Sequence, residues 1–286
     1  MNELSDKQVA AMSPDALAPA AIEAKAETVA LAKVATPVSR TFVLAVFAGM
    51  FIAFGGAFFG MFLGDATLPF GVQRVLGGLL FCLGLELVLC CGAELFTGNA
   101  LMVCAKLSGK ISWGAILKNW VVVWLGNLAG GLLAAFMLYM SNLQGMNAGA
   151  VGDSFVSLAA GKAALDWVTL LFKAILCNVF VCLAVWIGFG ARTVVDKVVG
   201  ILLPIAAFVA MGFEHCVANM FFLSMGLACK AAGFGAGVAN IDVLTVGGMA
   251  YNLVFATVGN IIGGAVLVGV GYWLAYHKKG QDAAAK

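Results

Sequence analysis

A glutamate, a histidine and an asparagine stand close together inside an apolar run of the sequence, at Glu214, His215 and Asn219. Ionisable side chains at membrane depth are costly and normally face a cavity or the inside of a helix bundle. The segment has a partial copy 120 positions earlier, where Glu94 and Asn99 stand in the run GAELFTGNA. Two polar interruptions at corresponding places in hydrophobic segments are typical of a transport site. The sequence therefore places its chemistry in these two segments.

Comparing the two copies separates two kinds of role. The shared residues are predicted to brace the chain at each interruption, the carboxylates by accepting backbone N–H bonds: Glu94, Glu214, Asn99 and Asn219. His215 is unshared, because Leu95 stands at the matching place in the first copy. A histidine has an unperturbed pKa of about 6.5, so it could donate a hydrogen bond or a proton to an anion. Thr97, in the opposite copy, offers a hydroxyl that could face His215. The functional role is therefore predicted for His215.

The composition is that of a polytopic membrane protein. Hydrophobic residues make up 63% of the chain and charged residues 10%, against roughly 45–50% and about 25% in soluble domains. The net charge of +2 gives no reason to expect a nucleic-acid partner. The eight cysteines have no C-x-x-C spacing and lie in or beside apolar runs. They are predicted to serve packing, and the sequence predicts neither a metal nor a cofactor.

About 20 apolar residues cross a bilayer as a helix. The sequence predicts six such crossings, of which the second and fifth are broken: 41–63, 75–91 with a short continuation at 99–105, 119–140, 165–190, 198–227 with a break at 212–218, and 247–276. Residues 41–276 are thus predicted to form a transmembrane domain, in which 141–162 is a loop. Residues 1–40 and 277–286 are predicted cytoplasmic segments, the first with a surface helix around 20–34 that ends at Pro37.

The distribution of lysine and arginine predicts that both termini are cytoplasmic. With six crossings the termini share a side, and that side collects most of the Lys and Arg residues. The other side has only Arg74, Lys162, Lys173 and Lys230.

A second internal match extends the repeat. Five residues of the third crossing recur 133 positions later in the sixth: Asn119, Gly126, Asn127, Gly130 and Gly131. Each half then has three crossings, and an odd number predicts an inverted repeat with its site between the halves. The glycines favour close helix packing. For Asn127 and Asn260, packing alone and a role in the pore lining or in a hydrogen-bond network both remain open.

Four separate motifs resemble the formate/nitrite transporter family: GAELFTGN, GFEHCVANM, A-x-L-C-N-x-x-V-C-L-A-V-W (174–186) and VGNIIGG (258–264). The resemblance covers residues 41–276. It implies an all-α, aquaporin-like protomer with broken second and fifth helices, assembled as a homopentamer in the bacterial inner membrane. It also implies that each protomer has a pore for small anions such as formate, nitrite or hydrosulfide. The N-terminal segment would plug the cytoplasmic mouth in one state, as is thought of relatives.

The resemblance also carries roles onto residues of this chain. The central histidine falls on His215 with Thr97 opposite, and the anion-attracting vestibule lysine falls on Lys162. Polar pore positions match Asn178 and Asn260. The periplasmic constriction would consist of Phe81, Leu85 and Phe208, and the cytoplasmic slit of Leu95 with Phe96. Glu86 departs from the pattern of formate-type relatives, which have an apolar residue there.

These residues suggest a channel or a proton-coupled transporter rather than an enzyme. Lys162 would concentrate the anion, which sheds its water at the phenylalanines, and His215 would then stabilise or protonate it, so that flux follows the titration of the histidine. The motifs resemble the formate branch of the family most, so formate is the expected substrate, with nitrite and hydrosulfide as alternatives. A membrane electron carrier would need paired histidines or clustered cysteines. A water or glycerol channel would need Asn-Pro-Ala at the breaks, which the sequence lacks.

Overall fold

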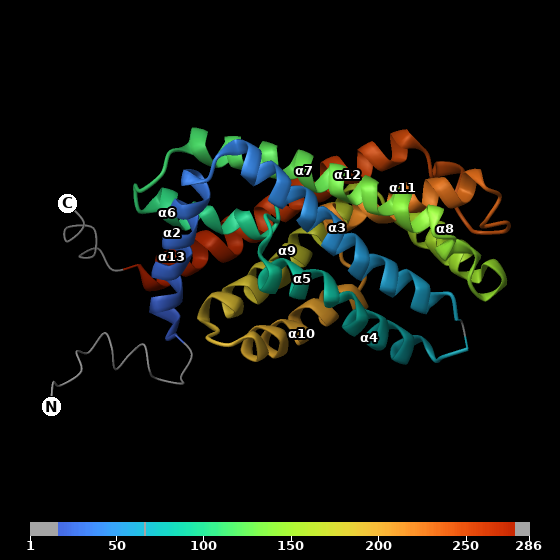
Figure 1. Ribbon diagram of the computed structural model, residues 1–286, viewed down its shortest axis with the longest axis horizontal. Coiled ribbons are helices and arrows are strands. Elements are labelled where there is room, and N and C mark those ends of the chain that lie inside the picture. Colours follow the sequence, from blue (N-terminus) through green and yellow to red (C-terminus); the bar gives the residue numbers. More distant parts are fainter. Residues whose placement is uncertain (1–16, 66, 278–286) are drawn as a thin grey trace, which may run out of the picture.

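The computed structural model describes residues 17–65 and 67–277, and these are built entirely from helices and their connections (Figure 1). Helices that form the main part of the crossings are α3 (Val38–Leu63), α4 (Phe70–Phe81), α7 (Trp113–Met140), α9 (Trp167–Gly190), α10 (Val194–Ala210), α11 (Cys216–Ala231) and α12 (Val246–Ile261). The other α-helices are α2 (Pro19–Ala35), α5 (Leu83–Leu87), α6 (Val103–Leu107), α8 (Ala150–Ala163) and α13 (Gly271–Tyr276). Figure 1 shows α2, α6 and α13 at one end of an elongated bundle and α8 at the other.

The membrane crossings confirm the predicted fold class. Five helical segments in the described ranges are long and apolar enough to cross a bilayer: 38–63, 70–92, 113–140, 167–190 and 246–276. The second runs from α4 through α5 and ends in a π-helical turn at 88–92, after which a shorter apolar piece covers 98–107. α10 and α11 are each too short to cross alone. Together they make the fifth, broken crossing.

Some predicted boundaries were wrong. The second and third crossings begin earlier than expected, at Phe70 and Trp113. The supposed loop at 141–162 contains α8, whose Phe155 is fully buried against Phe221 with ring centroids 5.9 Å apart. The helix was missed because its polar and small residues make it too weakly hydrophobic to read as a crossing, although its aromatic side chain reaches the core.

The N-terminal helix α2 is also more deeply placed than a surface helix would be. Ile22, Ala26 and Ala30 are buried, and so are the carboxylates of Glu23 and Glu27. Small alanine side chains let α2 lie against α6 and α9. The expected end near Pro37 is confirmed, since α2 stops at Ala35. Of the predicted terminal segments, residues 1–16 and 278–286 lie outside the described residues.

Glycines in the repeated third and sixth crossings let backbones touch. A Cβ on Gly130 would stand 2.0 Å from the carbonyl oxygen of Val46 in α3, and one on Gly263 would stand 2.1 Å from that of Ile175 in α9. Both contacts are between equivalent places in the two halves. The packing role predicted for these glycines therefore fits the structure.

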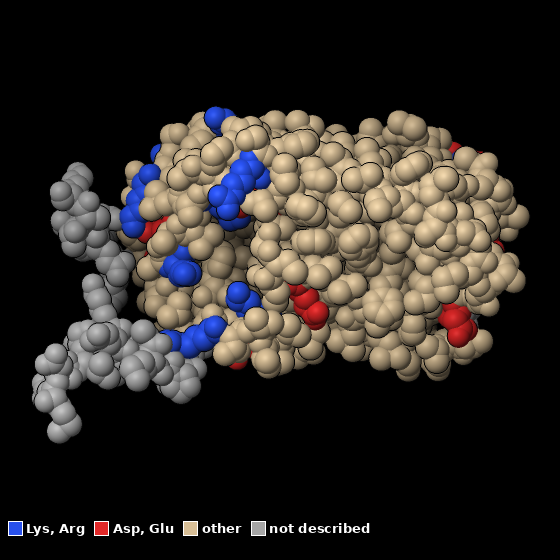
Figure 2. Space-filling model, in the orientation of Figure 1, with Lys and Arg blue, Asp and Glu red and all other residues tan. Residues whose placement is uncertain are grey.

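Charged side chains gather at one end of the molecule. Figure 2 shows lysines and arginines over the end where α2, α6 and α13 lie, whereas the visible middle of the surface carries few charges. A nearly uncharged middle is what a bilayer requires of a lipid-facing surface.

We expect Gly263→Ala to prevent correct packing of the sixth crossing, because the new methyl group would overlap backbone that cannot move alone. Gly271→Ala is the matched control, since a Cβ there meets nothing within 4 Å. Size-exclusion chromatography and thermal unfolding in detergent would compare the two. Equal unfolding temperatures would show that the contact at Gly263 is not a constraint.

Candidate functional site

Both breaks begin at a glycine with a positive φ angle. Gly92 ends the first helical segment with φ +82°, and Gly212 follows α10 with φ +71°, a conformation that glycine adopts without steric cost. The chain then runs without regular structure until helix resumes at Gly98 and at Cys216. Backbone groups in these stretches lack helical partners, and at membrane depth they must find others inside the protein.

Two asparagines supply those partners in the same way in each half. The Asn127 side chain accepts from the Phe96 N–H at 2.9 Å and donates to the Glu94 carbonyl at 2.9 Å. Asn260 accepts from the Cys216 N–H at 2.9 Å and donates to the Glu214 carbonyl at 2.9 Å.

Each of these two side chains also anchors its break to the first crossing of its half. Asn127 donates to the Ala45 carbonyl and Asn260 to the Ala174 carbonyl. Both asparagines are fully buried. Among the roles left open by the sequence, the structure shows hydrogen-bond networks for both asparagines.

The two glutamates brace their breaks through side chains, not through the backbone N–H groups that we expected. Oε2 of Glu94 accepts from the Asn99 amide at 2.7 Å, and Oε2 of Glu214 accepts from the Asn219 amide at 2.7 Å. The same amides reach onward to Asn119 and Asn252, which are equivalent positions in the third and sixth crossings.

Each of the two carboxylates also forms an ion pair with a lysine. Lys162 of α8 lies 2.9 Å from Oε1 of Glu214, and Lys33 of α2 lies 2.7 Å from Oε1 of Glu94. Each lysine stands five residues before the helix that opens its half, α3 or α9. The repeat therefore includes α2 and α8, and Lys33 is the counterpart of Lys162. No role was predicted for Lys33, because the equal spacing of the two lysines appears only with the helix starts at Val38 and Trp167.

The two breaks meet at a hydrogen bond between Thr97 and His215. Thr97 Oγ1 and His215 Nε2 are 2.9 Å apart, and both residues are buried. Each directly precedes a half-helix, Thr97 before the helical turn Gly98–Met102 and His215 before α11. The other ring nitrogen, Nδ1, accepts the Ala218 N–H at 3.0 Å. The positive ends of two helix dipoles thus converge on this pair.

A cavity of about 480 Å³ leads to His215 from the end of the molecule where α8 lies. Its described lining has three cationic residues, Arg74, Lys162 and Lys173, and one carboxylate, Glu214. Arg74 donates to the carbonyls of Val209 and Ala210, which end α10. This vestibule therefore has an excess of positive charge. Arg74 and Lys173 were assigned no role from the sequence, although they belong to the few cations predicted for that side.

A second, much smaller chamber of about 10 Å³ lies behind the vestibule. Phe81, Phe208 and His215 line both spaces, and the two phenylalanine rings meet edge to face at 5.7 Å. Leu85 and Leu95 line only the inner chamber. Its volume is about what one water molecule needs, and its walls are apolar apart from the imidazole. The structure thus brings the predicted constriction residues Phe81, Leu85, Phe208 and Leu95 together around His215.

Two other predicted pore residues lie elsewhere, and so does Glu86, for which no pore role was predicted. Phe96 packs on Trp120 with ring centroids 6.1 Å apart and lines neither chamber. Asn178 donates to the carbonyls of Thr97 and Asn260, so it supports the site without lining it. Glu86 is partly exposed on α5 and lines neither space.

At the opposite end a cavity of about 170 Å³ is lined by Lys33, Lys118 and Asn119. Its position mirrors the vestibule, because Lys33 is the counterpart of Lys162, which lines the vestibule. Cationic lining at both ends of an apolar centre fits the passage of an anion.

Comparisons with known proteins agree with this arrangement. Residues 20–274 match the model of the formate/nitrite transporter family. The chain is 40% identical to the formate channel FocA of Escherichia coli K12 over 271 residues, which cover 92% of this chain and 95% of FocA.

Two solved structures are similar to this fold. A pentameric formate channel with formate bound has a TM-score of 0.77 and 38% sequence identity, covering 84% of this chain and 98% of that one. An ion channel of the FNT family also has a TM-score of 0.77, with 28% identity and coverage of 89% and 98%.

We expect Lys162→Met to destabilise the protein, because it leaves the buried Glu214 carboxylate without its cation, a change that typically costs about 3–5 kcal/mol. Adding Glu214→Gln should restore most of the loss in thermal unfolding measured in detergent. Lys173→Met, which removes a cation from the same vestibule, is the control and should change the unfolding temperature less. A double variant no more stable than Lys162→Met would refute the bracing role of this pair.

Proposed function

The chain belongs to the formate/nitrite transporter family, and from this premise we propose that it is a channel that conducts formate and similar small anions across the bacterial cytoplasmic membrane. Members of this family are transporters, not enzymes. Formate is proposed because FocA and the solved pentameric channel are both formate channels. The anion would share the narrow centre of the protein with the Thr97–His215 pair.

The observation that carries the proposal is the Thr97–His215 hydrogen bond beside an apolar chamber. An anion that enters from the vestibule must lose most of its water at Phe81 and Phe208, where the chamber has room for about one water molecule. Desolvating a charge is costly unless hydrogen bonds replace the water. His215 is the polar side chain that lines this chamber, and Thr97 is hydrogen-bonded to it.

The hydrogen bonds of His215 determine which protons the Thr97–His215 pair can donate. Because Nδ1 of His215 accepts the Ala218 N–H, a neutral imidazole carries its proton on Nε2 and donates it to Thr97 Oγ1. The threonine hydroxyl proton is then free for an anion. A proton on Nδ1 would deprive Ala218 of its acceptor and put positive charge at the start of α11. We therefore favour a neutral His215 that stabilises the anion through Thr97, in place of the titrating histidine expected from the sequence.

Charge along the path supports selection of anions. The N-terminal ends of the two half-helices point toward the Thr97–His215 pair, and such ends favour negative charge. Arg74 caps the carbonyls at the end of α10, which offsets the opposite end of a helix dipole. Lys162 on one side and Lys33 on the other would concentrate anions, with part of each charge balanced by its glutamate.

Assembly and orientation complete the proposal. We propose a homopentamer of independent pores, because the similar solved channel is pentameric. The cation-rich end with α2 and α13 would face the cytoplasm, so that both termini lie inside. Residues 41–276 would form the channel domain, flanked by cytoplasmic segments 1–40 and 277–286. Lipids would surround the channel domain. A proton that accompanies the anion would be bound by the anion itself.

Uptake into proteoliposomes tests the substrate. Formate, nitrite and hydrosulfide would be offered singly at equal concentration, and we expect formate flux to be the largest. Protein-free liposomes control for leakage of the neutral acids. Nitrite or hydrosulfide flux well above that of formate would overturn the choice of formate and leave the anion path in place.

We expect Thr97→Val to lower formate flux by roughly 10- to 100-fold, because valine keeps the shape of threonine but removes the hydroxyl that would replace water, and a hydrogen bond to a charged group contributes about 1.5–3 kcal/mol. Thr97→Ser keeps the hydroxyl and is the matched control. Initial rates in proteoliposomes at several pH values would be compared. A Thr97→Val protein with the rates of Thr97→Ser would contradict the proposed role of the pair.

A further inference from the structure

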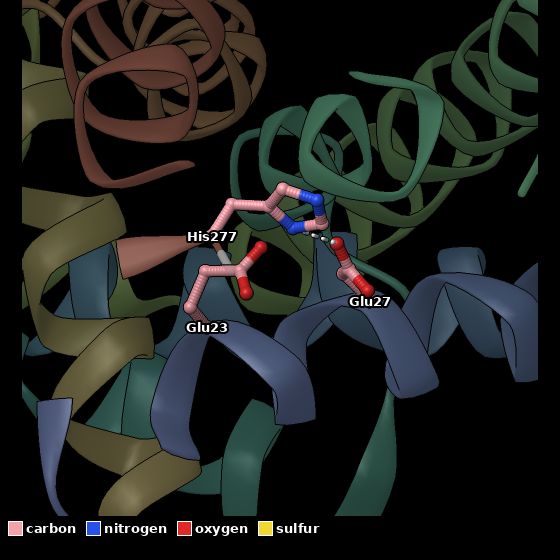
Figure 3. Close-up of side chains that lie close together, drawn as sticks. All are labelled: Glu23, Glu27 and His277. Atoms are coloured by element: carbon pink, nitrogen blue, oxygen red, sulfur yellow. Dashed lines mark ion pairs between the residues drawn. The ribbon is translucent and has the colours of Figure 1, made fainter. Parts of the chain in front are cut away.

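Three candidate metal ligands lie together at the end of the molecule where α2 meets the C-terminal end of α13 (Figure 3). Glu23 and Glu27 stand one helical turn apart on α2, and His277 directly follows α13. One ligand atom from each residue lies within 4.8 Å of the others. None of the three lines the vestibule or the inner chamber.

The ligand set is enclosed. Glu23 is 1% exposed, Glu27 is 3% exposed and the His277 side chain is 7% exposed. Figure 3 shows both carboxylates and the near ring nitrogen turned toward one another between α2 and His277. Carboxylates taken this far from water are normally paired or bound to a cation.

The spacing suits a tetrahedral transition-metal ion. His277 Nδ1 and Glu27 Oε1 are 3.5 Å apart. Two ligands at about 2.1 Å from a tetrahedral zinc ion are about 3.4 Å apart. This pair therefore needs little movement to share an ion, and Glu23 lies close enough to supply the third ligand.

Neighbouring groups orient the carboxylate of Glu27. Lys110 contacts Oε2, the oxygen that does not face His277. Ser108 contacts Oε1 and lies 3.3 Å from His277 Nδ1, and its own oxygen accepts from Trp273 Nε1 at 2.8 Å. Lys110 and Trp273 are thus outer partners, of the kind that hold metal ligands in place. The Ser108 hydroxyl would turn aside or stay as a neutral ligand.

We propose that Glu23, Glu27 and His277 bind one divalent transition-metal ion of the zinc class. An imidazole with two carboxylates suits zinc, cobalt or nickel, whereas magnesium and calcium prefer oxygen ligands alone. The ion joins α2 to the end of α13. Because α2 continues without interruption to Lys33, the ion would also restrain the lysine that holds Glu94 at the first break. That last consequence rests on the proposed function, but metal binding does not.

Zinc titration of the purified full-length protein in detergent tests the site. The protein would carry no polyhistidine tag, would be treated with EDTA, and would have Cys90→Ser and Cys91→Ser, because these are the exposed thiols. We expect one zinc ion per chain in isothermal titration calorimetry, and a rise in unfolding temperature that grows with zinc concentration. Amide hydrogen exchange in 19–35 should slow when zinc is bound.

Variants assign the ligands. His277→Gln and Glu23→Gln should each weaken zinc binding at least tenfold, while Asp242→Asn, at an exposed acid elsewhere, should bind as the parent does. No binding by the parent at about 100 μM zinc, or equal binding by both ligand variants and the control, would overturn the site. Should a ligand variant fail to fold, the absorption spectrum of the parent protein with added cobalt decides. Visible bands typical of tetrahedral nitrogen and oxygen ligation would support the site. Thiolate charge-transfer bands, or no bands, would refute it.

Discussion

Two helices stop inside the membrane, and the need to satisfy the backbone groups that they release governs the rest of this structure. Water is scarce at that depth, so each freed N–H and C=O must find a partner in the protein. Asn127 and Asn260 provide these partners with the same atoms and nearly the same distances in both halves. They can do so only because glycines beside them bring the third and sixth crossings into contact with the first crossing of each half. The hydrogen bonds of the asparagines therefore depend on the close packing at the glycines.

The glutamates connect the two breaks to α2 and α8, the helices at the ends of the bundle. Each carboxylate is held on one side by an asparagine amide and on the other by a lysine from α2 or α8. A carboxylate beside an anion path would repel the anion, but here its charge is balanced by the lysine. The arrangement links the centre of the protein to its surface through a single chain of contacts. On the side of α2 this chain continues to the cluster of Glu23, Glu27 and His277.

The centre itself breaks the twofold repeat. Leu95 and His215 occupy matching places, so one break contributes an apolar wall and the other an imidazole. Thr97 supplies the hydroxyl that faces this imidazole, and the Ala218 N–H fixes which ring nitrogen accepts. Under the proposed function, an asymmetric pair at a symmetric meeting point would give a small anion one place to bind. Bracing, which both halves need equally, remains duplicated.

The sequence by itself determined the membrane class, the crossings, the doubled break and the singular position of His215. These follow from local hydrophobicity and from repeated spacing, which a single chain displays directly. It did not reveal that α8 is a helix or that α2 is buried, because weakly hydrophobic helices can be recognised only by their packing. For the same reason it did not reveal the lysine partners of Glu94 and Glu214, which lie on these two helices. It also left open whether Asn260 braces a break, since an amide can equally line a pore. Only the tertiary structure decided this, by placing each amide between carbonyl and N–H groups that lie far apart along the chain.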